Sequence, residues 1–220
     1  MRALIFGSTG MVGSEALKEA IKNPEITEIT IVNRRKANTD QGVKEIIHAN
    51  FLDYSSIKDQ ISGYDIVIYC LAVYGNAKGM TEEKYYEITH DYVIELVKVI
   101  ENPKTVFIFF SAAGANSKSN LHWAKTKGIT ENDLLEFKFK SFYALRPGGI
   151  RASDRSKFAN TGMKIADVIL WPVINVLFPK FAITSNQIGQ SMVKIALRGY
   201  EKQILENVDI RRSIGLKRGV

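Results

Sequence analysis

Cysteine is almost absent from this 220-residue chain, which contains a single one, Cys70. One thiol excludes an internal disulfide framework, and its place in an apolar run predicts a small buried residue. Because chains without disulfides are typical of reducing compartments, we expect a cytoplasmic protein. The three histidines, His48, His90 and His122, lack the spacing of metal ligands, so no metal site is predicted.

Long apolar runs and clustered basic residues are also missing. No apolar run reaches the ~18 residues that a membrane span requires, and residues 2–6 resemble a strand rather than the start of a signal peptide. The formal net charge is +7, but the basic residues lack the interleaved aromatic residues of a nucleic-acid patch. We therefore expect neither a nucleic-acid partner nor membrane contact, and an anionic cofactor accounts for part of the positive charge.

Apolar strands alternate with amphipathic helices along the chain. Hydrophobic residues make up 45% of the sequence and charged residues 24%, which suits one ordinary core. Strands are expected at 2–6, 28–32, 43–49, 65–72, 105–111, 141–147 and 203–210. Helices are expected directly after the first strand and at 55–61, 81–102, 121–137, 163–178 and 185–199. The pattern predicts an α/β fold with a doubly wound parallel sheet, Rossmann-like, as a single domain over 1–220. Residues from about 150 to 220 are expected to add a small C-terminal substrate-side lobe.

Three glycines, Gly7, Gly10 and Gly13, stand three residues apart between the first strand and the first helix. Gly7 permits a tight turn, Gly10 lets the backbone approach a pyrophosphate, and Gly13 allows the helix to pack closely. Free N–H groups at the helix N-terminus then attract phosphates. The alternative is a purely structural turn. A nucleoside-triphosphate loop is excluded because no Gly-Lys-Ser/Thr follows.

Two arginines, Arg34 and Arg35, follow the second strand. In NAD-binding Rossmann folds an acidic residue near this point holds the ribose 2′-hydroxyl. A guanidinium instead pairs a 2′-phosphate through two hydrogen bonds. The sequence therefore predicts NADP(H) rather than NAD(H), with an ordinary basic loop as the alternative.

The stretches "GSTGMVG", "NRR", "FLD", "HDYV", "FFSAAGANSKSN" and "LRPGGI" occur in this order. Together they resemble the atypical and extended short-chain dehydrogenase/reductase superfamily, in particular its Tat-interacting-protein-like oxidoreductases. The resemblance covers nearly the whole chain and implies a Rossmann-like fold with bound NADP(H). Its implied cofactor-binding residues are Gly7, Thr9, Gly10, Met11, Val12 and Gly13 at the pyrophosphate, Arg34 and Arg35 at the 2′-phosphate, Asp53 at the adenine amino group, Leu71 and Ala72 beside the adenosine, Lys127 at the nicotinamide ribose, and Pro147 and Gly148 at the nicotinamide. Ser111 takes the place of the substrate-orienting serine.

The tyrosine that such enzymes use for proton transfer is missing. The family places it four residues before the lysine, whereas here Trp123 stands four residues before Lys127. An indole donates a hydrogen bond but does not titrate in the useful range. No tyrosine lies between 93 and 142, so no shift of alignment supplies one.

Two functions therefore stay open. One is an NADP(H)-dependent oxidoreductase with an altered proton relay, which acts on an unknown small carbonyl or alcohol through Ser111 and Lys127. His122, Tyr74 and Tyr143 are its candidate proton donors, and no spacing singles one out. The other is a non-catalytic NADPH-binding sensor that binds a protein partner or a second copy of itself. The apolar segment 165–181 is either a buried helix over the substrate side or a surface for a membrane or second subunit.

Overall fold

A seven-stranded parallel sheet forms the centre of the computed structural model, which describes residues 1–37, 42–73, 79–100, 102–154 and 181–216. The strand order is β3-β2-β1-β4-β5-β6-β9. In chain order these strands are β1 (Arg2–Phe6), β2 (Glu28–Asn33), β3 (Val43–Ile47), β4 (Ile66–Tyr69), β5 (Val106–Phe110), β6 (Ser141–Arg146) and β9 (Ile204–Glu206). The order reverses between β1 and β4, which is where a doubly wound sheet opens a ligand crevice. The doubly wound Rossmann-like fold is therefore confirmed.

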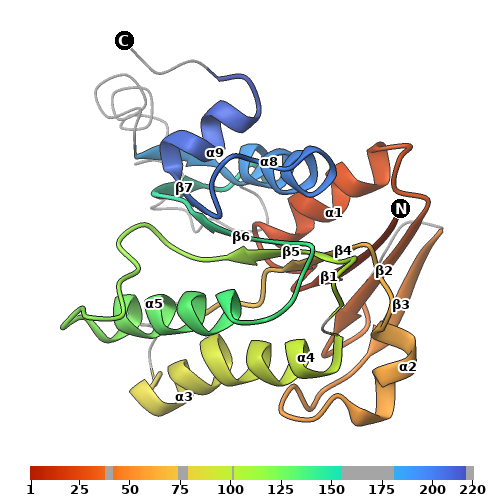
Figure 1. Ribbon diagram of the computed structural model, residues 1–220, viewed down its shortest axis with the longest axis horizontal. Helices are drawn as coiled ribbons and strands as arrows, with labels where there is room; N and C mark the ends of the chain where they lie inside the picture. Colours follow the sequence, from red (N-terminus) through yellow and green to blue (C-terminus); the bar gives the residue numbers. More distant parts are fainter. Residues whose placement is uncertain (38–41, 74–78, 101, 155–180, 217–220) are drawn as a thin grey trace.

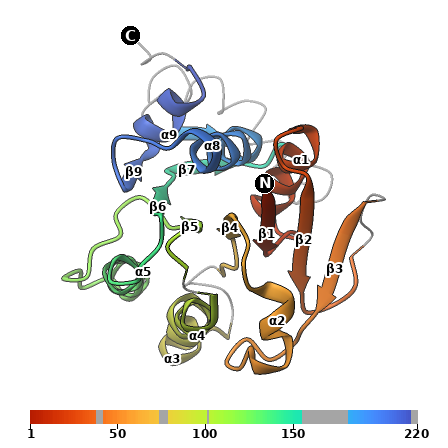
Figure 2. The ribbon, with the colours of Figure 1, turned by 45° about the vertical axis from the view of Figure 1, so that its right-hand side comes forward.

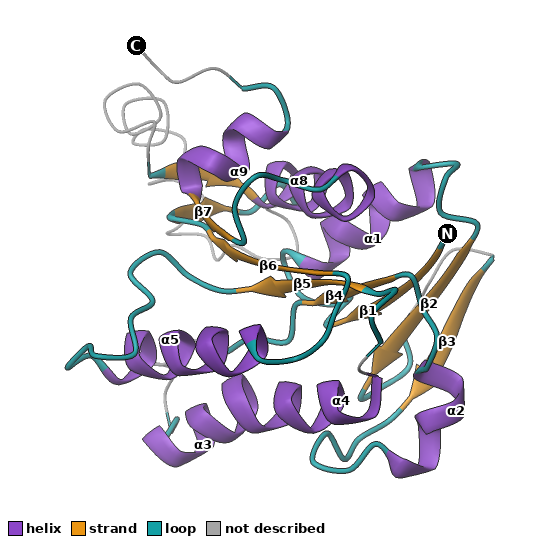
Figure 3. Cartoon of the chain, in the orientation of Figure 1, coloured by secondary structure: helices purple, strands orange, loops and turns teal. Residues whose placement is uncertain are grey.

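Helices cover both faces of the sheet (Figures 1 and 3). One layer contains α1 (Gly13–Lys22), α8 (Ser185–Arg198) and α9 (Asn207–Ser213). The other contains α2 (Lys58–Ile61) after the short helix η1 (Ser55–Ile57), a continuous run of α3 (Glu82–Tyr86), the π-helix η2 (Glu87–Asp91) and α4 (Tyr92–Ile100), and then α5 (His122–Leu135). The turned view in Figure 2 shows the same two layers. No helix within the described segments is long and apolar enough to cross a membrane.

Alternate residues of the central strands pack into the two layers. On β1, Ala3 and Ile5 join the apolar cluster beneath α1 and α8, whereas Leu4 and Phe6 join the cluster on the α4 and α5 side. All four side chains are fully buried. Burial on both faces explains why these strands are continuous apolar runs in the sequence.

The C-terminal part differs from its prediction. The strand expected over 203–210 ends at Glu206, and α9 follows at once. Glu206 and Asp209 form a capping box: the side chain of each residue accepts a hydrogen bond from the backbone N–H of the other. These bonds stabilise the start of a helix, so the strand ends here. A separate two-stranded parallel sheet joins β7 (Gly149–Arg151) to β8 (Ala182–Thr184). The expected helix 163–178 and all of the apolar segment except Phe181 lie outside the described residues.

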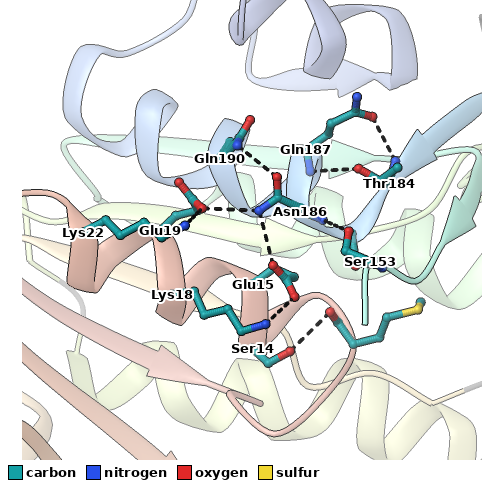
Figure 4. Close-up of polar contacts among 12 residues, drawn as sticks. Ser14, Glu15, Lys18, Glu19, Lys22, Ser153, Thr184, Asn186, Gln187 and Gln190 are labelled. Atoms are coloured by element: carbon teal, nitrogen blue, oxygen red, sulfur yellow. Dashed lines mark hydrogen bonds and ion pairs between the residues drawn. The ribbon is translucent and has the colours of Figure 1, made fainter. Parts of the chain in front are cut away.

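Helices α1 and α8 pack closely at a glycine of α8, and a cluster of polar side chains joins them (Figure 4). A Cβ on Gly189 of α8 would lie 2.7 Å from the carbonyl carbon of Glu15 on α1. Asn186 Nδ2 donates to Glu15 Oε2 and to Glu19 Oε1, both at 3.3 Å. The backbone N–H of Asn186 also donates to Ser153 Oγ at 3.0 Å. These contacts fix the segment after β7 against the helix that follows the glycine turn.

Candidate functional site

The glycine turn joins β1 to α1 and has no room for a side chain at two of its three glycines. Gly7 has a φ of +77°, and a Cβ there would lie 2.7 Å from the carbonyl group of Cys70. A Cβ on Gly13 would lie 2.1 Å from the carbonyl oxygen of Gly7. Gly10 is exposed, and a Cβ there would meet only that same oxygen, at 3.3 Å. Gly7 and Gly13 thus shape the turn, while Gly10 leaves its outer side open to a ligand.

The N-terminus of α1 presents unpaired backbone donors beside this opening. The N–H groups of Met11 and Val12 donate to no other described residue, and the Val12 side chain cannot cap the helix. Thr9 and Gly10, which precede them, are exposed. Free N–H groups and the positive end of the helix dipole together favour an anion at this position.

Polar contacts, one of them buried, fix the loop that follows β2. Ser8 Oγ in the glycine turn donates to Asn33 Oδ1 at 3.0 Å, at the end of β2. Asn33 Nδ2 and the backbone N–H of Ala37 both donate to Glu45 Oε1 on β3, each at 2.9 Å. The backbone on both sides of the basic residues is therefore held in place by neighbouring strands.

Arg34 and Arg35 lie in this loop, and both are exposed. Neither makes a hydrogen bond or ion pair with a described residue. The structure therefore leaves two guanidinium groups available at the end of β2, beside the strand that leads into the glycine turn.

Asp53 and Leu71 lie near the ends of the sheet but outside the cavity described below. Asp53 is exposed, and its Oδ1 accepts the backbone N–H of Ser55 at 2.8 Å, which lowers the pKa of Asp53. Leu71 is half-buried and packs against the core on the α4 side. Both residues thus have structural roles that require no ligand.

A cavity of about 540 Å³ opens where β1, β4, β5 and β6 end. It is the place that the fold predicts for a ligand. Eight residues predicted from the sequence line it: Gly10, Met11, Val12, Ala72, Ser111, Lys127, Pro147 and Gly148. Seven further residues line it that no motif had indicated as ligand contacts: Cys70, Val73, Tyr85, Phe110, Ala112, Trp123 and Ile150.

Lys127 is the one charged side chain among the described residues that line this cavity. It is 4% exposed, and its Nζ donates to the carbonyl oxygen of Phe110 at 2.9 Å. The same Nζ lies 4.9 Å from the centre of the Phe109 ring. Burial lowers the pKa of Lys127 to about 8, although the carboxylate of Glu131 acts in the opposite direction. The amine therefore exchanges its proton close to neutral pH.

A buried ion pair holds the side chain of Ser111. Ser111 Oγ donates to Glu131 Oε1, and Glu131 is only 2% exposed. Arg146 on β6 donates from Nε to both oxygens of Glu131, at 3.0 and 3.2 Å, and also from Nη2. Its Nη1 binds Glu206 Oε1 at 3.0 Å, and hydrogen bonds to the two carboxylates raise the pKa of Arg146. Glu131 was not predicted, although it lies one helical turn after Lys127, on the same face of α5.

Trp123 lines the cavity one turn before Lys127, so an indole occupies the place expected for the family's tyrosine. Its ring lies against Gly114, where an added Cβ would be 3.5 Å from Trp123 Cη2. Trp123, Lys127 and Glu131 follow one another at four-residue intervals and therefore lie on one face of α5, which is turned toward the cavity and the residues below it.

Of the other candidate proton donors, Tyr143 and His122 do not line the cavity. The hydroxyl of Tyr143 donates to the carbonyl oxygen of Tyr200 at 3.4 Å and accepts its N–H at 3.1 Å. His122 packs edge-on against Tyr85, with 5.3 Å between ring centres. Tyr74 lies outside the described residues. Tyr85 on α3 does line the cavity, and it was missed because it precedes the searched window and no motif marks it.

Solved structures share this fold at low sequence identity. A short chain dehydrogenase family protein from Francisella tularensis matches with a TM-score of 0.69 and 12% identity, over 97% of this chain and 98% of its own. A short-chain dehydrogenase/reductase superfamily protein from Agrobacterium tumefaciens, determined with bound NAD, matches with a TM-score of 0.67 and 12% identity. That match covers 99% of this chain and 92% of the other. Both matches establish a Rossmann-like fold for this chain.

A relative from Candida albicans, "Protein FMP52, mitochondrial", is 29% identical over 96% of this chain and 94% of its own. Further fungal relatives carry the same name. The expectation of a cytoplasmic protein conflicts with these names and is wrong. A scarcity of cysteine indicates a reducing compartment, and that property does not distinguish the cytosol from the interior of a mitochondrion.

The model of the NAD dependent epimerase/dehydratase family matches residues 3–138, which is more than half of the chain. The matched part runs from β1 through α5 and includes the glycine turn, Ser111 and Lys127. Together with the solved structures, it confirms the resemblance to the extended and atypical short-chain dehydrogenase/reductases. The chain belongs to the NAD-dependent epimerase/dehydratase family.

Proposed function

We propose that the chain is an NADP(H)-dependent oxidoreductase that acts on a small carbonyl or alcohol, with Trp123 in place of the usual tyrosine. Membership of the family supports a nicotinamide cofactor. The choice of NADP(H) rests on one observation, which is the unpaired arginines in the fixed loop after β2. A 2′-phosphate supplies the anion that Arg34 and Arg35 lack in the described structure.

The open turn fits the rest of the dinucleotide. The space outside Gly10 admits a pyrophosphate, and the N–H groups of Met11 and Val12, together with Thr9, bind its oxygens. The exposed carboxylate of Asp53 retains acceptor sites for the adenine amino group, because the bond from Ser55 uses only part of its capacity. We assign the adenosine side to Leu71 and Ala72.

At the other end, Pro147 and Gly148 border the nicotinamide, and Lys127 binds the ribose hydroxyls. A bound nicotinamide supplies the two-electron redox chemistry. Lys127, with its pKa near 8, is able to hold or release a proton at the working pH. The apolar walls of the cavity, among them Trp123, exclude water from the reacting atoms.

Calorimetry with NADPH and NADH tests the cofactor assignment. Replacing Arg34 with Asp (R34D) should weaken NADPH binding by about 10- to 100-fold, because a charge-assisted hydrogen bond is worth roughly 1.5–3 kcal/mol. Binding of NADH should change much less. Lys104→Asp is the matched control: Lys104 is exposed and lies just before β5 begins, at the amino ends of the strands, whereas Arg34 follows the carboxyl end of β2. Equal NADPH-to-NADH affinity ratios in wild type and R34D would remove the assignment, and undetectable NADPH binding by wild type would refute the whole proposal.

The second candidate is a non-catalytic NADPH sensor that binds a protein partner or a second copy of itself. It is favoured by Trp123, since an indole cannot exchange the proton that the family's tyrosine exchanges. Single-turnover fluorescence separates the two functions: NADPH bound to the protein is mixed with a panel of carbonyl compounds, and NADP+ bound to the protein is mixed with the corresponding alcohols. Loss of NADPH fluorescence in the first mixture, or its appearance in the second, indicates an oxidoreductase. Tight NADPH binding without either change indicates the sensor.

A further inference from the structure

The hydroxyl group of Ser111 has a fixed polarity. Glu131 is paired with the guanidinium of Arg146 through both of its oxygens, as expected for an ionised carboxylate. An ionised carboxylate accepts hydrogen bonds and donates none. The single hydrogen of the Ser111 hydroxyl must therefore point toward Glu131. Toward the cavity, Ser111 Oγ therefore presents only lone pairs and acts as a hydrogen-bond acceptor.

This polarity is the reverse of what a carbonyl substrate requires. A carbonyl oxygen has lone pairs but no hydrogen, so Ser111 in this state cannot bind it. A hydroxyl group does carry a hydrogen, and Ser111 Oγ is able to accept it. The substrate-orienting role expected for Ser111 is thus restricted to ligands that donate a hydrogen bond.

The remaining cavity wall points to an uncharged ligand. Aromatic surface comes from Trp123 and Tyr85, and aliphatic surface from Val73 and Ile150. Among the described lining residues only Lys127 is charged, and its Nζ already binds a carbonyl oxygen. Such a wall stabilises an apolar body and provides no arrangement of charges for a second highly charged ligand beside the cofactor.

Building on the proposed function, we infer that Ser111 accepts the hydroxyl hydrogen of an apolar alcohol, and that Glu131 is the positioning residue that gives Ser111 this polarity and takes its proton during oxidation. The pair supplies the proton path that Trp123 cannot. The alcohol's C–H bond breaks and its electron pair passes with the hydrogen to the oxidised nicotinamide. The O–H bond breaks as its proton passes to Ser111 Oγ, and the former Ser111 proton passes to Glu131. The products are a carbonyl compound, a reduced nicotinamide and a neutral Glu131.

A binding experiment without turnover tests this inference. The protein is first saturated with 2′-phospho-ADP-ribose, which fills the nucleotide site but contains no nicotinamide and so permits no redox reaction. Calorimetry or saturation-transfer NMR then gives dissociation constants for 1-phenylethanol and acetophenone, which differ by a hydroxyl against a carbonyl. We expect wild type to bind the alcohol about 10-fold more tightly, the ratio expected for one hydrogen bond that only the alcohol makes.

Two variants assign the preference to the two residues. Ser111→Ala removes the acceptor, so the ratio should fall to about 1. Glu131→Gln reverses the polarity: Arg146 only donates, so the amide oxygen turns toward Arg146 and the amide N–H toward Ser111. The Ser111 hydrogen is then free to point into the cavity. The affinity of acetophenone relative to that of 1-phenylethanol should therefore increase by about 10-fold over wild type. A merely structural role for Glu131 would not move this ratio, and thermal melts confirm that each variant is folded.

The outcomes are distinguishable. If 2′-phospho-ADP-ribose does not bind, the proposed cofactor site fails. If it binds but acetophenone binds as tightly as the alcohol, or neither probe binds, the inference about Ser111 and the apolar alcohol is overturned. The inference is also overturned if Ser111→Ala keeps the wild-type ratio of alcohol to acetophenone affinity. This outcome can be read even if Glu131→Gln does not fold.

Discussion

Lys127 gives the most quantitative prediction, because its burial couples folding to pH. The ordinary pKa of a lysine is 10.5, and burial lowers that of Lys127 to about 8 in the folded chain. Between these values the unfolded chain binds the proton and the folded chain does not. The free energy of unfolding should therefore rise with pH through this window, and below pH 8 the folded chain carries the full cost of a buried cation.

The size of the effect follows from the two pKa values. One pH unit of separation corresponds to about 1.4 kcal/mol, so the interval from 10.5 to about 8 corresponds to roughly 3 kcal/mol. Between pH 7.5 and 9.5 the contribution of Lys127 should change by about 2 kcal/mol. Cys70 and buried tyrosines also affect stability at high pH, since burial raises their pKa values. Their contribution cancels when the stability of wild type is compared with that of a Lys127 variant that retains Cys70 and the tyrosines.

Urea denaturation of wild type and Lys127→Met at pH 7.5, 8.5 and 9.5 measures the difference. The stability of wild type relative to the variant should increase by about 2 kcal/mol across the series. Lys125→Met is the matched control, because Lys125 is exposed on the same helix and its loss removes the same charge. Its difference from wild type should be nearly constant. Parallel curves for wild type and Lys127→Met would refute the claim that Lys127 is buried with a lowered pKa.

Two further predictions concern the turn and the ion pair. Gly13→Ala forces a Cβ against the carbonyl oxygen of Gly7 and should destabilise the fold by about 1–3 kcal/mol or more, measured by thermal melts. Gly10→Ala should leave the melting temperature near that of wild type but weaken NADPH binding, measured by calorimetry. Arg146→Met leaves the buried Glu131 uncompensated and should cost about 3–5 kcal/mol in urea denaturation. Glu206→Gln removes a half-exposed partner of the same arginine and should cost less than about 1 kcal/mol. Similar costs for these two variants, or equal stability of the two glycine variants, would contradict the structure.

The fold was predictable because each of its signals is local. Apolar runs mark the seven strands of the sheet, and the spacing of Gly7, Gly10 and Gly13 marks the first turn. The error over 203–210 has a local cause too: the capping box of Glu206 and Asp209 outweighs the β-forming valine and isoleucine around it. The strand pair β7–β8 escaped prediction because its two strands are short and far apart in sequence.

The candidate site was predictable only where a motif marks it. Ser111 and Lys127 were found through the resemblance, and the structure brings both to one cavity. Glu131 was missed because its importance depends on Arg146, which reaches it from a different strand. Tyr85 was missed because its helix meets the cavity only after the chain has folded. No local pattern carries either contact.

In the oxidoreductase that we propose, the exchange of one residue on α5 changes the chemistry of the site without changing the fold. With a tyrosine at position 123, the proton would travel through a phenol beside Lys127. With Trp123 there, the polar side chains at the end of β5 are Lys127, which donates to the carbonyl oxygen of Phe110, and Ser111, which donates to Glu131. Lys127 Nζ is hydrogen-bonded to the carbonyl oxygen of Phe110, whereas Glu131 is connected to the cavity through the hydrogen bond that it accepts from Ser111. In the mechanism that we infer, the same carboxylate determines both which ligand Ser111 binds and where its proton goes, which makes ligand preference and proton transfer inseparable.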